Sequence, residues 1–227
     1  MDSSLLDEFR AALRAANVDE AFVEKLAAYG ALVLETNRSF NLTGAKSVAE
    51  FVPHILDSLT IAPFVRDSLV DIGSGGGLPA IPLAIVTGVT ITMVETTLKK
   101  ARFLEKALEE LGLGGSVVAE RAEIAGHDPA LREKFVTGTA RAVSTAPTVA
   151  ELLLPFIALG GQAVLQRGGI DPHEYNALAD ASLILGGQVV TEAPNTSKSI
   201  ILVEKKSKTP GKYPRRVGIP AKKPLCF

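Results

Sequence analysis

SLVDIGSGGGLPAI, residues 68–81, joins an apolar run to a loop in which four of the five positions from Gly73 to Gly77 are glycine. The apolar run predicts a buried β-strand, and Pro79 suits the first turn of a following helix, where a missing N–H costs nothing. A glycine-rich loop lets backbone amides approach a ligand closely beside a helix N-terminus. Because a tight turn needs only one or two glycines, the stretch predicts a nucleotide-like ligand.

The spacing of the glycines leaves two kinds of ligand open. Gly73, Gly75 and Gly77 form a G-x-G-x-G pattern, and Leu78 stands where a dinucleotide fingerprint has its third glycine or alanine. A pyrophosphate is therefore disfavoured. The next expected strand, TITMVE, ends at Glu95. An acid at the tip of a second strand accepts hydrogen bonds from ribose hydroxyls in both nicotinamide and S-adenosylmethionine sites.

Short β-branched runs alternate with helical segments from residue 68 onward. The expected strands are 69–72, 90–95, 116–119, 137–143, 162–166, 188–191 and 200–203. The expected helices are 79–87, 98–111, 128–134, 147–159 and 172–185. This order predicts an α/β fold whose mainly parallel sheet is covered on both faces. The turn APNTSKS between the last two strands is too short for a parallel crossover, so we expect a C-terminal antiparallel hairpin. A seven-stranded sheet of this kind is typical of class I (Rossmann-like) S-adenosylmethionine-dependent methyltransferases.

An N-terminal helical extension is expected to precede this domain. Residues 2–40 have the pattern of two helices, with a capping box formed by Asn17 and Glu20 before the second, and a third helical stretch covers 48–63. We divide the chain into a helical extension, a methyl-donor-binding domain and a basic, Pro- and Lys-rich tail that we expect to be extended. The predicted boundaries are 1–64, 65–206 and 207–227.

Composition narrows the class of protein and the choice of partner. At 227 residues, 47% of them hydrophobic and 22% charged, the chain suits one soluble α/β domain with a short appendage. Its single cysteine, Cys226, and an N-terminus without the pattern of a signal peptide lead us to expect a cytoplasmic location and no membrane span. Nine basic residues and one acid, Glu204, lie between Lys198 and Phe227. A basic tail of this kind favours contact with RNA or DNA, and a solubilising role is the equal alternative.

Several motifs in matching order resemble one family, the bacterial small-subunit ribosomal RNA guanine-N7 methyltransferases, also called glucose-inhibited division protein B. The resemblance runs from about residue 30 to the end of the chain. NLTG, HILDSL and the Lys/Pro tail are the specific signals, whereas the glycine loop is shared by many methyltransferases. The matching stretches are NRSFNLTG (37–44), HILDSL (54–59), VDIGSGGGLPAIPLAI (70–85), KKARFL (99–104), RAE (121–123), ARAV (140–143) and the tail TPGKYPRR with GIPAKKPL.

The resemblance implies a set of site residues and partners. S-adenosylmethionine contacts are expected at Asp71, Gly73, Ser74, Gly75, Gly77, Leu78, Glu95, Thr96, Ala122, Glu123 and Arg141. Residues expected to face the transfer pocket or the RNA are Asn41, His54, Arg121, Arg141 and Arg167, the last standing where the family usually has a lysine. The implied substrate is 16S rRNA, free or in the small subunit or an assembly intermediate, with the basic tail from Lys205 to Lys223 as an RNA contact.

The chemistry implied by the resemblance needs few protein groups. Guanine N7 is an unprotonated acceptor on the major-groove edge, so no general base is needed, and alignment and electrostatics carry the rate. The histidines His54, His127 and His173 are scattered, which argues against a metal site. Two rival functions remain open at this point. They are a nicotinamide-dependent oxidoreductase, consistent with Glu95, and a non-catalytic RNA-binding or ribosome-assembly protein built on the basic tail.

Overall fold

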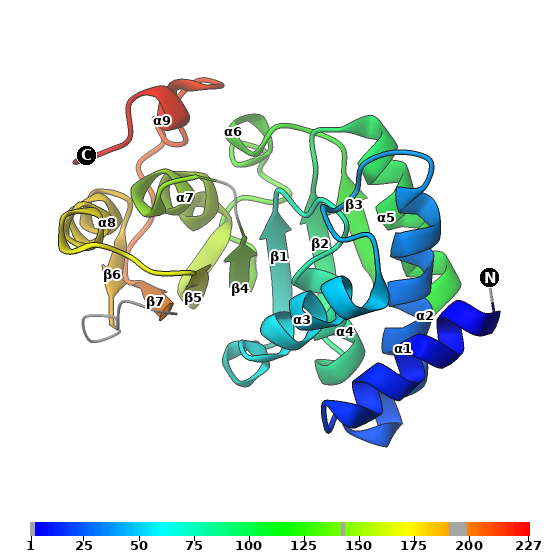
Figure 1. Cartoon of the computed structure of the whole chain (residues 1–227). Coiled ribbons are helices and arrows are strands. Elements are labelled where there is room, and N and C mark those ends of the chain that lie inside the picture. The colour runs from blue at the N-terminus through cyan, green and yellow to red at the C-terminus, as the bar shows by residue number, and fades with distance from the viewer. Residues whose placement is uncertain (1–2, 142–143, 191–198) are drawn as a thin grey trace.

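A single seven-stranded sheet in the order β3-β2-β1-β4-β5-β7-β6 forms the centre of the protein. The structure is a computed structural model that describes residues 3–141, 144–190 and 199–227. The strands are β1 (Ser68–Ile72), β2 (Thr90–Val94), β3 (Gly115–Val118), β4 (Phe135–Ala140), β5 (Ile157–Arg167), β6 (Gly187–Val189) and β7 (Ser199–Lys205). Neighbours among β1 to β5 pair in parallel, and β7 is antiparallel to both β5 and β6 (Figure 1). The predicted α/β class I sheet with a C-terminal antiparallel pair is confirmed.

Helices cover both faces of the sheet. They are α1 (Ser3–Ala15), α2 (Glu20–Asn37), α3 (Val48–Leu59), α4 (Ala80–Thr87), α5 (Leu98–Leu111), α6 (Ala122–Ala125), α7 (Ala146–Leu153), α8 (Pro172–Ile184) and α9 (Ile219–Lys222), with 3-10 turns η1 (Ala62–Phe64) and η2 (Leu154–Phe156). Side chains of β1 alternate between two cores: Leu69 packs in one with α1 to α5, and Val70 and Ile72 pack in the other with α7 and α8. No helix among the described residues is both long and apolar enough to span a bilayer.

The N-terminal helices share a core with α4 and α5. Phe9 of α1 lies directly against Gly30 of α2, where an added Cβ would stand 2.5 Å from the Phe9 ring. The predicted capping box is wrong. Asn17 has φ 58° in a left-handed turn, and Asp19 caps α2 instead, its carboxylate accepting from the Ala21 amide at 2.9 Å.

Two predicted helices differ from those observed. Residues 128–134 form turns, because Glu133 has φ 55° and its carboxylate accepts from the amide of Thr209 in the tail at 2.8 Å. The helix expected over 147–159 ends at Leu153, and β5 already begins at Ile157. Pro155 has no N–H to donate to the preceding turn, which explains the early end. The outer ends of the expected strands 137–143 and 188–191, and all of the turn APNTSKS except its last residue, Ser199, lie outside the described residues.

The C-terminal tail packs against the domain. Tyr213 is 6% exposed in the same core as α7 and α8, and the tail contains the helical turn α9 where an extended segment was expected. Lys205 is 1% exposed, and its ammonium donates to the Leu154 carbonyl and the Thr209 hydroxyl, each at 2.5 Å. The prediction that Lys205 contacts RNA is therefore wrong.

Candidate active site

The predicted ligand residues gather at the carboxyl edge of the sheet. β1 lies between β2 and β4, so Glu95 after β2, the glycine loop after β1 and Arg141 after β4 come from adjacent strand ends. Arg167 is the last residue of β5, the next strand along. The chain runs from β1 to β2 on one side and from β4 to β5 on the other, so the direction of the connections reverses between β1 and β4. Such topological switch points are where open α/β sheets bind ligands.

The glycine loop depends on backbone angles that only glycine adopts easily. Gly73, Gly75 and Gly77 have φ of 69°, 57° and 95°. At Gly77 an added Cβ would stand 2.4 Å from Ile81, so this glycine brings the loop close to α4. At Gly75 the one described atom within 4 Å of an added Cβ is the Gly73 carbonyl oxygen, at 3.8 Å, so the described residues leave space for a ligand there.

Two side chains from outside the loop, one after β2 and one on α2, hold this loop in place. Glu95 is 5% exposed, and its two carboxylate oxygens accept from the amides of Gly75 at 2.9 Å and Thr97 at 2.8 Å. The hydroxyl of Tyr29 on α2 donates to the Gly76 carbonyl at 2.8 Å. Each Glu95 oxygen keeps a second lone pair, so the acid can still accept from a ribose hydroxyl.

Asp71, beneath the loop, has an unused acceptor. It is 1% exposed, and its Oδ1 accepts from the Thr139 hydroxyl at 2.8 Å. Its Oδ2 is buried and has no hydrogen-bond partner among the described residues. Burial raises the pKa of Asp71 to about 7. An unpaired buried carboxylate oxygen beside an open glycine loop fits a cationic donor such as the ammonium of S-adenosylmethionine.

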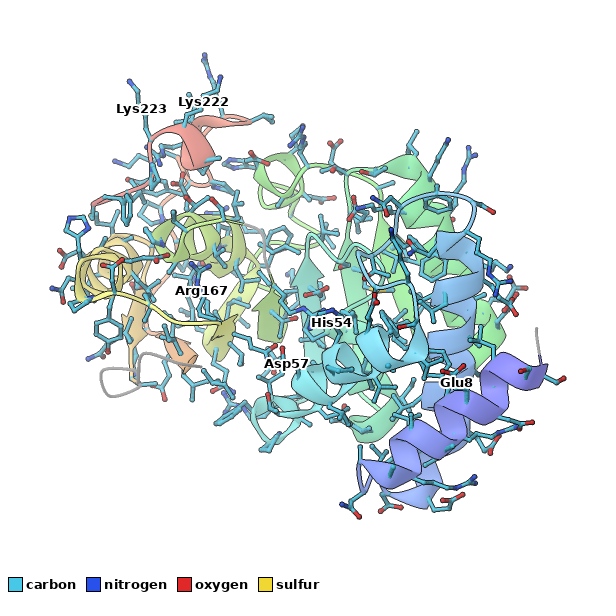
Figure 2. The ribbon with its side chains drawn as sticks, viewed as in Figure 1. Glu8, His54, Asp57, Arg167, Lys222 and Lys223 are labelled. Carbon is cyan, nitrogen blue, oxygen red and sulfur yellow. The ribbon has the colours of Figure 1, made fainter. Side chains whose placement is uncertain are left out.

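A cavity of about 890 Å³ adjoins this edge of the sheet, between α3 and the ends of β4 and β5. It is lined by Pro53, His54, Asp57, Thr60, Arg141, Gln166, Arg167, Gly168, Gly169 and Ile200. Figure 2 shows His54 and Asp57 together on α3, with Arg167 on the other side of the cavity. HILDSL, the motif that contains both α3 residues, therefore forms one wall of this pocket.

Arg141 lines this cavity and contacts α3. Its guanidinium lies 3.6 Å from the Asp57 carboxylate and donates to the backbone carbonyl of His54 at 3.4 Å. Partial burial and the Arg141 charge lower the pKa of His54. His54 is therefore neutral at pH 7, and its imidazole can accept or donate without adding charge to the pocket.

Arg167 lines the cavity but binds to the protein itself. Its guanidinium donates to the Ser144 carbonyl at 2.5 Å and to the Glu174 carboxylate at 2.7 Å. The same Glu174 oxygen accepts from the Ala146 amide at the start of α7. Arg167 thus holds the chain between β4 and α7, a role that the sequence pattern did not indicate.

Other predicted site residues lie apart from the cavity. Asn41 is exposed and lines a separate hollow of about 520 Å³ with Glu8 of α1, which Figure 2 places on the far side of the molecule from Arg167. Arg121 is exposed before α6. Glu123 of α6 accepts from the amide of Gly218 in the tail at 2.9 Å, so one of its oxygens already binds the protein itself.

The remaining predicted cofactor contacts surround the glycine loop or follow the adjacent strands. Ser74 is 2% exposed, and its hydroxyl donates to the Asp71 carbonyl at 3.0 Å. Leu78 is half-buried against the core that contains α4 and α5. Thr96 is exposed after Glu95, and Ala122 is half-buried at the first position of α6.

The residue that organises the NLTG loop is Asn37, which sequence reasoning passed over. Its amide nitrogen donates to the carbonyls of Thr43 and Ala45, each at 3.0 Å, and its oxygen accepts from the amides of Leu42 and Thr43. A single side chain thereby fixes four backbone groups of the loop. The only available signal was its place as the first residue of NRSFNLTG.

No group of three or more His, Cys, Asp or Glu residues in the described ranges is arranged to hold a metal ion. The arrangement of these residues suits a pocket that positions two reactants. The glycine loop, Asp71 and Glu95 form one half, and the cavity with His54, Asp57 and Arg141 forms the other. This division suits group transfer between a nucleotide-like donor and a separate acceptor.

Comparison with known proteins identifies the family. A family model described as GidB, rRNA small subunit methyltransferase G, matches residues 22–201. Proteins named ribosomal RNA small subunit methyltransferase G from Trichormus variabilis and Leuconostoc citreum are 39% and 36% identical to the chain. The first alignment covers 86% of this chain and 86% of the relative, and the second covers 97% and 99%.

Solved structures support the fold. A methyltransferase from Pyrococcus furiosus superposes with a TM-score of 0.53 at 12% identity, over 79% of this chain and 98% of the other. A branched-chain polyamine synthase mutein from Thermus thermophilus gives 0.55 at 13% identity, over 68% and 56%. With the match to the family model over most of its length, the chain belongs to the GidB family, rRNA small subunit methyltransferase G.

Proposed function

We propose that this rRNA small-subunit methyltransferase transfers the methyl group of S-adenosylmethionine to N7 of a guanine in 16S rRNA. The observation that carries the proposal is the cavity beside the glycine loop. Its charged groups are two arginines and an aspartate, and the pKa of its one histidine is lowered. N7 is already a free acceptor, so a pocket that positions the base without removing a proton suits it.

The residues around the loop fit S-adenosylmethionine. The open space at Gly75 and the unpaired Oδ2 of Asp71 suit the amino-acid end of the donor, and Glu95 suits its ribose. Leu98, 62% exposed at the start of α5 just after this strand end, supplies an apolar surface for the adenine. When bound, S-adenosylmethionine supplies a methyl group already activated by a sulfonium.

The protein's contribution is alignment and charge. Arg141 donates to the guanine O6 beside N7, which fixes the base with its acceptor exposed. Positive charge moves onto the base during transfer, and the Asp57 carboxylate 3.6 Å from Arg141 offsets it. His54, neutral at pH 7, adds no opposing charge.

The target guanine is accessible only outside a regular helix. A-form RNA hides its major-groove edge in a deep, narrow groove, so we propose a loop or a partly assembled ribosomal particle as the substrate. Exposed cations of the tail contact the RNA backbone, namely Lys212, Arg216, Lys222 and Lys223. An rRNA substrate also supports a cytoplasmic location.

The experiment is a comparison of two assays on the purified protein. Tritium from methyl-labelled S-adenosylmethionine is followed into small-subunit rRNA, and NADH absorbance is followed with candidate carbonyl substrates. Transfer of label without NADH oxidation supports the proposal. NADH oxidation without transfer supports the oxidoreductase, and RNA binding without either reaction supports the assembly protein. The antiparallel β7 beside β5 argues against the oxidoreductase.

A further inference from the structure

The C-terminal tail follows a fixed path across α6 and α7. The guanidinium of Arg132 donates to the carbonyls of Thr209 and Tyr213, each at 2.9 Å. The ring of His127 is hydrogen-bonded to the carbonyl of Pro214 at 2.7 Å. The Glu123 carboxylate also accepts from the Gly218 amide, so these four backbone positions of the tail are hydrogen-bonded to side chains of the domain.

One cation of the tail is used entirely for this attachment. Arg215 is paired with Glu151 of α7, which is fully buried, through contacts of 2.8 Å and 2.6 Å. The neighbouring Arg216 has no carboxylate partner among the described residues, and Lys212 lies over the Tyr213 ring, 5.2 Å from its centre. The tail therefore holds one arginine inward and presents other cations to solvent.

A groove of about 560 Å³ lies between the tail and α6. Its walls include Ile124, 50% exposed, and Val217, 47% exposed, two apolar side chains that no other part of the described protein covers fully. Lys212 and Arg216 also line it. Figure 1 shows α6 and α9 beyond the tips of the strand arrows, the edge of the sheet that carries the glycine loop.

We infer that this groove binds an unpaired nucleotide of the rRNA strand that flanks the target guanine. The inference rests on the proposed function. The apolar walls suit the face of a base, the Arg216 guanidinium can stack on it, and Lys212 and Arg216 suit the adjoining phosphates. Lys222 and Lys223, which Figure 2 shows projecting at the end of α9, extend the same cationic surface. An acidic peptide would leave the apolar walls of the groove without a partner, and an apolar peptide would leave its cations without one. A nucleic acid strand matches both.

The test uses the full chain and naked small-subunit rRNA. The double variant Lys212→Ala/Arg216→Ala is compared with Lys25→Ala/Lys134→Ala, which removes two exposed lysines from α2 and from the residue before β4. We expect the groove variant to raise the Kd for RNA about tenfold or more. Its slope of log Kd against log salt should fall by about 1.4, as for two lost single-strand phosphate contacts. The control should match wild type, and the Kd for S-adenosylmethionine should be the same in all three.

A third variant, Ile124→Asp, tests the apolar wall. It should weaken RNA binding at every salt concentration without lowering Tm, because Ile124 is half exposed. If both groove variants bind RNA as tightly as the control variant does, the inference is overturned. If they bind RNA normally but no longer bind a ribosomal protein, the groove is a protein-binding site instead. Failure of the wild-type protein to methylate rRNA would instead overturn the proposed function, so the two failures are distinguishable.

Discussion

The Tyr29 hydroxyl donates to the Gly76 carbonyl at 2.8 Å, which ties the second N-terminal helix to the middle of the glycine loop. Tyr29 is fully buried, and burial raises the pKa of its hydroxyl. Its ring packs against Phe51 of α3, with centroids 5.9 Å apart. The N-terminal layer therefore supports the loop directly and connects it to the helix that lines the cavity.

Tyr29→Phe should weaken S-adenosylmethionine binding about fivefold, the effect of losing one hydrogen bond worth about 1 kcal/mol. Isothermal titration calorimetry measures the Kd for S-adenosylmethionine of the two proteins. The KM for rRNA should stay within twofold of wild type, because the substitution is on the donor side of the site. Equal cofactor affinity in the two proteins would show that the loop does not need this support.

Asp71→Asn should change how stability depends on pH. The folded-state pKa of Asp71 is raised from 3.8 to about 7, so the folded protein holds a proton that the unfolded chain releases. Wild-type stability relative to the variant should therefore fall as pH rises from 5 to 7, with a slope approaching about 1.4 kcal/mol per pH unit.

Chemical denaturation of both proteins at several pH values measures this difference. A difference in the free energy of unfolding that stays constant across the range would mean that Asp71 is ionised throughout. Adding S-adenosylmethionine should flatten the slope, since a cationic ligand favours the ionised carboxylate.

Arg141→Lys should lower the rate of methyl transfer at saturating S-adenosylmethionine at least tenfold. Lysine keeps the charge but cannot span the His54 carbonyl, Asp57 and a guanine oxygen with one planar group. Single-turnover kinetics measures the rate. Arg102→Lys, on the exposed side of α5, is the matched control and should be unaffected. A wild-type rate in both variants would remove Arg141 from the transfer step.

Arg167 and Glu174 should behave as a coupled structural pair. Arg167→Ala is expected to destabilise the protein by about 1–3 kcal/mol, because the Ser144 carbonyl and the Glu174 carboxylate lose their donor. In a double-mutant cycle with Glu174→Ala, the coupling energy should be about 1 kcal/mol or more. Strictly additive effects on stability would leave Arg167 available for the substrate, the role first expected of it.

Local patterns predicted the sheet and the closeness of the glycine loop to Glu95. A strand and the turn after it depend on residues close together in the sequence, so local patterns are enough to locate them. Because β1 and β2 are adjacent and parallel, the ends of these strands place Gly73 and Glu95 side by side. Residues whose roles depend on distant partners were not predictable in this way. In the sequence, Lys205 does not differ from the other cations of the tail, and only the structure shows its hydrogen bond to the Leu154 carbonyl. Arg132 likewise binds a tail that is about eighty residues away in the sequence.

The identity of the methylated atom tests the central claim most directly. Small-subunit rRNA treated with the protein and S-adenosylmethionine is digested for nucleoside mass spectrometry, and a second portion is reduced and cleaved with aniline, which breaks RNA at N7-methylguanine. The account predicts N7-methylguanosine and strand cleavage at an unpaired guanine, both lost with Arg141→Ala. A methyl group on any other atom, or equal cleavage in a plain duplex stem, would contradict it.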